Sequence, residues 1–222
     1  MTISCVQAEV EKLFVQLELN KATSVCLTAV TAGSGTTSLA MALYERYLLA
    51  GYRTLYLDFN LDNPSFIQSI ASLNLIAHKT TSSVFAGLIA PTRTGEQLRY
   101  RDPSALQQAL NNWQDDYQRV VIDCAAMKQA NPGGIHASLV ASCTAATLLV
   151  VKAGHCSAAS LENALQELTG SPFVSLILNQ FTLQSLAEAI LQSRLIGNRL
   201  GAAQKQKLRK LMMNYSIFQQ VI

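Results

Sequence analysis

Residues 24–38 have the sequence SVCLTAVTAGSGTTS and combine a strand, a turn and the start of a helix. Residues 24–31 are mostly apolar or β-branched, which predicts a buried strand. Gly33 and Gly35 break this strand, and the hydroxyl residues 36–38 are typical caps for a helix over residues 39–51. Backbone amides freed by the glycines and the positive end of the helix dipole converge at such a junction. The stretch therefore predicts a cradle for phosphate.

The cradle lacks the lysine that usually completes it. Turns of this kind commonly end Gly-Lys-[Ser/Thr], in which the lysine reaches the β- and γ-phosphates and the hydroxyl binds Mg²⁺. In this chain Thr36 follows Gly35 directly. The candidate nucleotide-binding residues of the turn are Gly33, Ser34, Gly35, Thr36, Thr37 and Ser38. The alternative is an ordinary tight turn whose hydroxyls only cap the helix.

The composition is that of a soluble globular chain with a large core. Of its 222 residues, 50% are hydrophobic and 14% are charged, against a usual charged share of about a quarter. We expect one domain over residues 1–182 and a helical extension over residues 183–222. No apolar run approaches the roughly 20 residues that cross a bilayer, and no signal sequence is recognisable at the N-terminus. The five scattered cysteines are expected to be free thiols in a reducing cytoplasm.

Basic side chains gather toward the C-terminus. No acidic residue follows Glu188, whereas the basic residues Arg194, Arg199, Lys205, Lys207, Arg209 and Lys210 do. This asymmetry indicates an arm with its own partner and argues against a nucleic-acid-binding protein. Apolar residues recur there at helical spacing, namely Leu208, Leu211, Met212, Tyr215, Phe218 and Ile222. The arm is expected to dock on the protein's own sheet, on a membrane protein or other subunit, or on anionic lipid.

Strands and helices alternate along the chain. The sequence predicts strands at residues 24–31, 52–59, 119–124, 146–153 and 173–179, and helices at 5–19, 39–51, 103–117, 135–142 and 157–168. Residues 66–90 are predicted to form a short helix followed by irregular structure, and residues 91–101 a surface loop. Two further helices are expected after residue 182, separated near residues 197–201. Wholly apolar strands alternating with helices predict an α/β fold with a mostly parallel sheet covered on both faces.

Polar residues follow several of the predicted strands. Asp58, Asp123 and Asn179 each stand at a strand's carboxyl end, as does the glycine turn. Ligand sites of parallel α/β sheets gather at this edge. An aspartate after a strand is more often only a helix cap or turn former, but the ordered combination favours a nucleotide site. Thr37, Asp58 and Asp123 are the candidate Mg²⁺ ligands.

These motifs resemble the Min-system and partition-ATPase (MinD/ParA-like) branch of the P-loop proteins, and most closely the cytoplasmic domain of bacterial tyrosine autokinases. The matching segments are TAVTAGSGTTS (28–38), LDFNLDNP (57–64), VVIDCAA (120–126), LLVVKAG (148–154) and LILN (176–179). The helix before the first strand resembles the family's oligomerisation helix, with Glu9 and Lys12 in place and Val15 instead of its last arginine.

The resemblance implies a three-layer P-loop NTPase-like domain over residues 1–182. It implies ATP or ADP with Mg²⁺ as the ligand, Asn179 as a contact to the base, and Asp58 and Asp123 as the catalytic residues if the chain is active. It further implies a homo-oligomer in the cytoplasm, peripheral at the inner membrane. The implied partner is a membrane-anchored polysaccharide co-polymerase or another inner-membrane protein.

Departures from the family pattern argue against phosphoryl transfer. Thr36 replaces the P-loop lysine, Asn60 replaces the second aspartate of the second motif, and Asp62 stands in place of an arginine. Alanines replace both prolines after the third motif, and beyond Tyr117 the sequence contains only Tyr215, not a tyrosine cluster. Phosphoryl transfer depends on positioning and charge neutralisation, so a large loss of rate is expected without the lysine.

Three functions remain open at this point. The first is a non-catalytic, pseudokinase-like scaffold or regulator in bacterial exopolysaccharide or capsule biosynthesis and export. The second is an active MinD/ParA-like ATPase with a displaced or in-trans cation, acting as a polar-localisation factor for pili or flagella. The third is a dimer module that binds no nucleotide. Nucleotide binding without turnover favours the first, turnover the second, and absence of binding the third.

Overall fold

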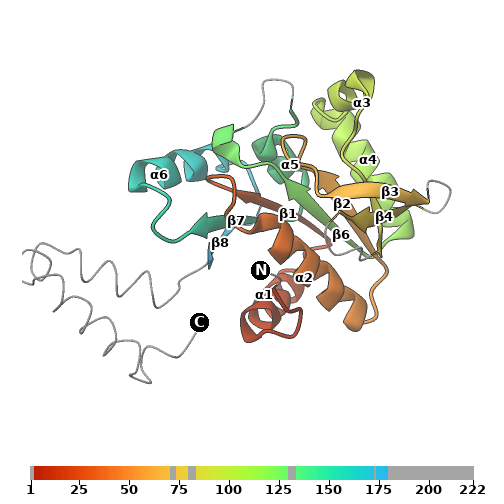
Figure 1. The fold of residues 1–222 in the computed structure, drawn as a ribbon, viewed down its shortest axis with the longest axis horizontal. Coiled ribbons are helices and arrows are strands. Elements are labelled where there is room, and N and C mark those ends of the chain that lie inside the picture. Colours follow the sequence, from red (N-terminus) through yellow and green to blue (C-terminus); the bar gives the residue numbers. More distant parts are fainter. Residues whose placement is uncertain (1–2, 71–73, 80–83, 130–133, 173, 180–222) are drawn as a thin grey trace, which may run out of the picture.

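The computed structural model describes residues 3–70, 74–79, 84–129, 134–172 and 174–179 (Figure 1). The extension predicted over residues 183–222, with its basic arm and apolar stripe, lies outside the described residues. Within the described part, no helix is long and apolar enough to cross a bilayer.

Eight strands form one sheet with the order β3-β4-β5-β2-β6-β1-β7-β8. Their bounds are β1 Ser24–Ala29, β2 Thr54–Phe59, β3 Phe66–Ile70, β4 Leu75–His78, β5 Val84–Leu88, β6 Arg119–Cys124, β7 Ala146–Lys152 and β8 Val174–Asn179. Neighbouring strands pair in parallel except at β4, which is antiparallel to both β3 and β5. The sheet is therefore mostly parallel, as the sequence predicts.

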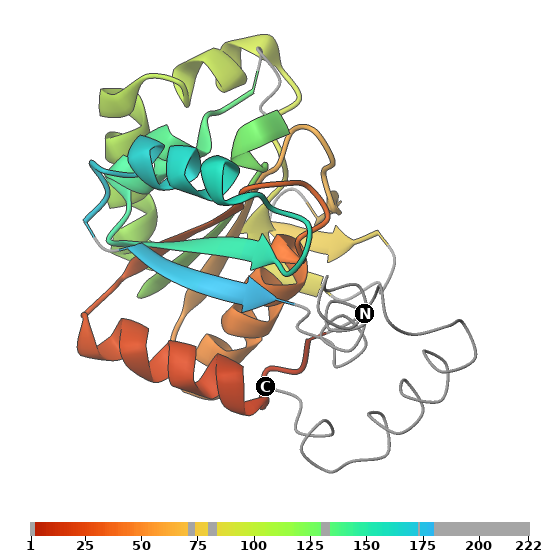
Figure 2. The ribbon, with the colours of Figure 1, turned by 90° about the vertical axis from the view of Figure 1, so that its left-hand side faces the viewer.

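The helices lie on both faces of this sheet (Figures 1 and 2). Their bounds are α1 Ala8–Leu19, α2 Thr36–Leu49, α3 Thr94–Arg99, α4 Pro103–Asp116, α5 Ala137–Cys143 and α6 Ala158–Glu167, with a 3₁₀ turn at Met127–Gln129. Apolar side chains of α1 and α2 share one core with the sheet, and those of α4, α5 and α6 share a second core on its other face. The central strands β1 and β2 are buried along their whole length because both faces are covered. The predicted three-layer α/β fold is confirmed.

The prediction for residues 66–90 is wrong. This segment contains the three short strands β3, β4 and β5 instead of a short helix and irregular structure. Ile67 and Val84 are 52% and 56% exposed, so these strands do not show the continuous apolar character of the central ones. Short, half-exposed strands give a weak periodic signal that is easily mistaken for a helix turn.

The surface loop predicted for residues 91–101 is also wrong in part. It contains the helix α3, whose residues are all at least partly exposed. A helix without a buried face has no apolar periodicity by which it can be recognised in a sequence.

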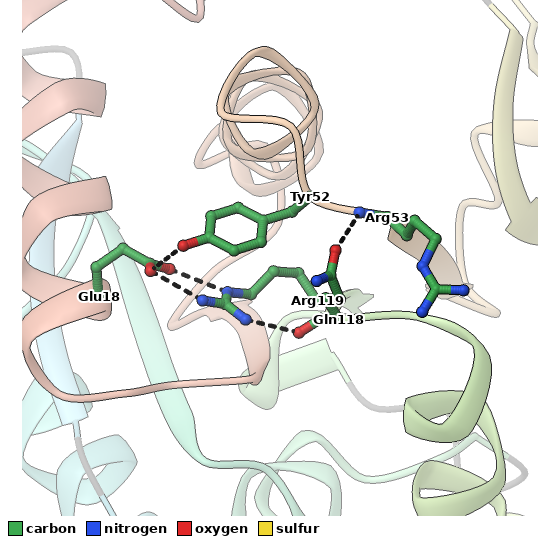
Figure 3. Close-up of polar contacts among 5 residues, drawn as sticks. All are labelled: Glu18, Tyr52, Arg53, Gln118 and Arg119. Carbon is green, nitrogen blue, oxygen red and sulfur yellow. Dashed lines mark hydrogen bonds and ion pairs between the residues drawn. The ribbon is translucent and has the colours of Figure 1, made fainter.

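A polar cluster joins α1 to the amino-terminal edge of the sheet (Figure 3). The Arg119 guanidinium donates to both Glu18 carboxylate oxygens at 2.8 and 2.9 Å, and the Tyr52 hydroxyl donates to the same carboxylate at 2.7 Å. The Arg119 guanidinium also stacks 3.9 Å from the centre of the Tyr52 ring. Although burial acts to raise it, hydrogen bonds from Arg119 and Tyr52 hold the pKa of Glu18 below its ordinary value. Residues that are 101 apart in the sequence are thereby fixed together.

Replacing Arg119 by alanine is expected to lower the free energy of unfolding by about 2–3 kcal/mol, because the half-buried Glu18 carboxylate loses its cation and Tyr52 loses its stacking partner. Urea unfolding at pH 7 measures this effect. Glu11→Ala is the control, since it breaks the Glu11–Arg46 ion pair by removing a side chain that is 48% exposed and that water screens. Equal losses from the two variants would contradict a special role for the Arg119 cluster.

Candidate functional site

The turn between β1 and α2 has the conformation that the two glycines make possible. Gly33 and Gly35 have φ angles of +73° and +88°, in the left-handed region that other residues avoid. The Ser34 hydroxyl donates to the Thr31 carbonyl at 2.7 Å and closes the turn on itself. The helix begins at Thr36 with Gly35 as its N-cap and no side-chain cap. The prediction that residues 36–38 cap a helix starting at residue 39 is therefore wrong: they form the first turn of the helix itself.

Asn179 holds the turn from the carboxyl end of β8. Its side-chain amide donates to the Ser34 carbonyl at 2.7 Å. A Cβ atom on Gly35 would lie only 2.2 Å from the Asn179 Nδ2 atom, so the two residues are packed against each other. The sequence correctly brings Asn179 to the turn, and its predicted contact with a nucleotide base stays a prediction.

Thr37 and Asp123 meet beneath the turn. The Thr37 hydroxyl donates to Asp123 Oδ2 at 2.6 Å, and the Tyr56 hydroxyl donates to the same oxygen at 3.2 Å. Asp123 is fully buried, and its Oδ1 atom has no hydrogen-bond partner among the described residues. Tyr56 is a member of this site that the sequence analysis missed, because its place depends on the register of β2 against β6.

Asp58 lies beside Asp123 but serves the adjoining loop. The two residues are paired across β2 and β6. Asp58 Oδ1 accepts the amide of Asn60 at 3.0 Å, and Oδ2 accepts the amides of Ser65 and Phe66 at 2.9 and 3.3 Å. Both oxygens are therefore engaged in fixing the connection from β2 to β3. The predicted roles of Asp58 in catalysis and metal binding would require it to give up some of these bonds.

Asp58 and Asp123 are two buried carboxyl groups next to each other, and this arrangement makes their charged forms unfavourable. Burial, followed by the negative charge of Asp58, raises the pKa of Asp123 to about 7, although the hydrogen bonds from Thr37 and Tyr56 act to lower it. Burial likewise raises the pKa of Asp58 to about 6 against the effect of its backbone amide partners. A cation beside the unpaired Asp123 oxygen would offset this cost. Together with the Thr37 hydroxyl, that oxygen is the kind of hard ligand that Mg²⁺ prefers, so the residues fit the predicted metal.

A hollow of about 420 Å³ opens at the glycine turn; Thr37 lines it, whereas the buried Asp58 and Asp123 and the supporting Asn179 are not among its lining residues. Its lining comes from the glycine turn, the connection after β2, the end of β4 and the end of β6: Ala29, Thr31, Ala32, Gly33, Ser34, Gly35, Thr36, Thr37, Ser38, Asn60, Asp62, Asn63, Ser65, His78, Cys124 and Ala126. No lysine or arginine occurs among these lining residues. The contribution of His78 was missed because the sequence did not reveal β4.

Comparisons with known proteins show similarity in fold alone. No family model and no curated protein matches the chain. The VpsO kinase domain is similar, with a TM-score of 0.61 and 19% identity over 78% of this chain and 92% of that one. The kinase domain of Escherichia coli tyrosine kinase ETK has a TM-score of 0.57 and 18% identity over 77% and 72%. Cobyrinic acid a,c-diamide synthase from Mycobacterium smegmatis, with an ATP analogue and magnesium bound, has a TM-score of 0.53 and 12% identity over 86% and 93%.

Proposed function

We propose that this chain binds ATP or ADP with Mg²⁺ in the hollow, transfers phosphate at no useful rate, and acts as a scaffold or regulator in bacterial exopolysaccharide or capsule assembly. One observation carries the proposal: Thr37 and the unpaired oxygen of Asp123 lie beneath a glycine turn whose usual lysine is Thr36. The site keeps the groups that hold a nucleotide and lacks the principal group that drives its reaction.

Binding would follow from groups that are already positioned. The glycine turn and the amino-terminal end of α2 offer backbone amides and the positive end of a helix dipole to the phosphates. Thr37 and Asp123 would hold Mg²⁺, which neutralises phosphate charge when bound. Asn179 stabilises the turn through the hydrogen bond from its side-chain amide to the Ser34 carbonyl.

Turnover is disfavoured by two features of the site. A neutral threonine cannot neutralise the charge that develops on the β- and γ-phosphates, which the usual lysine stabilises. The Asp58 carboxylate, the second candidate catalytic group, is fully buried and accepts three backbone amides, which leaves little of it to position an attacking nucleophile.

The setting in polysaccharide assembly is supported by two independent likenesses. The ordered motifs resemble those of bacterial tyrosine autokinases, and the fold is similar to two kinase domains, those of VpsO and of ETK. On this proposal the chain is a cytoplasmic homo-oligomer, peripheral at the inner membrane, that contacts a membrane-anchored co-polymerase. On α1, the exposed Val15 and Leu19 side chains leave apolar surface for such an assembly.

Calorimetric titration with Mg·ATP and Mg·ADP, combined with an assay of phosphate release, tests the proposal. We expect binding of both nucleotides, no release of phosphate above background and no labelling of the protein from γ-labelled ATP. Gly35→Val is the matched control, because its side chain is strained at a φ of +88° and collides with Asn179; it should lose binding. Its folding is checked by circular dichroism.

The other outcomes select the other functions. Sustained phosphate release would contradict the non-catalytic role and favour the MinD/ParA-like ATPase. If neither nucleotide binds, the third function, a dimer module that binds no nucleotide, is favoured. Equal affinity in the folded Gly35→Val variant would place the nucleotide elsewhere.

A further inference from the structure

A cation lies next to the part of the hollow's lining that β3 and β4 supply. This part is built by the start of β3 and the end of β4, where Phe66 pairs with His78. The next residue, Lys79, donates its backbone amide to the Ser65 carbonyl at 3.0 Å and its ammonium to the Pro64 carbonyl. Ser65 and His78 line the hollow. Two hydrogen bonds thus hold Lys79 next to the lining, one from its backbone amide and one from its ammonium group.

The Lys79 ammonium also lies within electrostatic reach of the buried Asp58 carboxylate. Burial raises the pKa of Asp58 and its amide partners act to lower it, and the positive charge of Lys79 acts in the same direction as those amides. Lys79 is exposed, and its ammonium is bonded to a neutral carbonyl. A lysine of this kind has a long flexible stem and can exchange a carbonyl for a more strongly bound anion at little cost.

We infer that Lys79 is the displaced counterpart of the missing lysine and contacts the terminal phosphates of a Mg²⁺-bound polyphosphate in the hollow. This inference rests on the proposed nucleotide site. A polyphosphate entering a hollow that holds Asp62 and lies above two buried aspartates needs a positive side chain in addition to the metal. Lys79 is a cation next to the lining residues Ser65 and His78, whereas the usual lysine would come from the turn itself. The ligand would then be held between two elements, the glycine turn and the β3–β4 hairpin.

Binding of two probes, Mg·tripolyphosphate and Mg·ATP, to a set of full-length variants tests this inference. Lys79→Gln removes the charge and keeps most of the stem, and we expect both probes to bind about tenfold more weakly. Lys79→Arg keeps the charge and should stay within about threefold of the parent, as expected for a charge-assisted contact. Lys21→Gln, the same change at another exposed lysine, is the control and should leave both affinities unchanged. Thermal unfolding confirms that each variant is folded.

The two probes separate this inference from the proposed function. If the parent binds tripolyphosphate in a Lys79-dependent way but not ATP, the inference stands and the nucleotide function fails. If the parent binds ATP and Lys79→Gln binds it equally well, the inference fails and the nucleotide function stands. If neither probe binds the parent, both fail. Phosphate release that disappears in Lys79→Gln would support the inference and contradict the non-catalytic role.

Discussion

Replacing Asp123 by asparagine is expected to abolish metal-dependent nucleotide binding and, at pH 8, to make the ligand-free protein more stable than the parent. Binding is lost because Asp123 Oδ1, which has no hydrogen-bond partner among the described residues, is the oxygen proposed to bind the metal, and the asparagine amide is a poorer ligand for Mg²⁺ than a carboxylate. We expect the affinity for Mg·ATP to fall at least a hundredfold, which corresponds to roughly 2.7 kcal/mol. Calorimetric titration measures this loss.

The gain in stability follows from the charge that the substitution removes. The fold raises the pKa of Asp123 to about 7 from an ordinary value of 3.8. The carboxyl group therefore favours folding most below pH 4, and this contribution is lost as the pH rises through about 7. At pH 8 the charged Asp123 carboxylate lowers the free energy of unfolding by about 4 kcal/mol. The asparagine removes this cost, but its unpaired amide lowers the free energy of unfolding by about 1–3 kcal/mol. The net gain at pH 8 is about 1–3 kcal/mol, and it becomes a loss of about 1–3 kcal/mol near pH 4, where the carboxyl group of the parent is neutral.

Urea unfolding of parent and variant at pH 5 and pH 8 checks the sign of this effect. The stability of Asp123→Asn relative to the parent should increase from pH 5 to pH 8. Asp62→Asn is the control, because Asp62 is exposed in the same site and should give no such difference. A gap between Asp123→Asn and the parent that does not depend on pH would contradict the account of Asp123.

Replacing Thr36 by lysine should strengthen the binding of Mg·ATP by about ten- to a hundredfold, since one charge-assisted contact to phosphate contributes about 1.5–3 kcal/mol. Thr36 lines the hollow at the first position of α2, so a lysine there would reach the phosphates from the glycine turn. Repulsion between the new cation and the helix dipole should lower the stability of the ligand-free protein by only about 0.3–1 kcal/mol. Titration at two salt concentrations measures the gain and its electrostatic origin.

Thr36→Met is the matched control, because methionine is of comparable length and uncharged, and it should not increase affinity. The gain from Thr36→Lys should be smaller in the presence of Lys79 than in the Lys79→Gln variant if both cations contact the same phosphates. An unchanged affinity in a folded Thr36→Lys variant would mean that other departures, such as Asp62, already limit the site.

The sequence was most informative where the chemistry is local. The strand, glycine turn and helix of residues 24–38 follow one another directly, so their order alone predicts the cradle and the position of Thr37 below it. The central strands were found because they are buried on both faces and therefore wholly apolar. Asp123 and Asn179 were placed at the site because the carboxyl ends of parallel strands share one edge of a sheet.

Contacts that depend on long-range pairing were not predictable in this way. The bond from Tyr56 to Asp123 exists only because β2 pairs with β6 in a particular register. Asp58 has the expected position, but its engagement by three amides depends on the path of the loop that follows. The sequence does not place His78 and Lys79 at the site, because β3 and β4 are short and half-exposed and are not recognisable from it. Strand pairing and the path of a loop are determined by tertiary packing, and a local sequence pattern contains no information about them.

The hydrogen bond between Asn179 and Ser34 affects the order in which parts of the protein fold during synthesis. It joins residues 145 positions apart, so the glycine turn leaves the ribosome long before the strand that supports it. Synthesis proceeds from the N-terminus, and closing so long a loop slows folding. The phosphate cradle is thus completed only when β8 has been made and paired at the edge of the sheet. Nascent chains that end before residue 179 should therefore be unable to retain nucleotide.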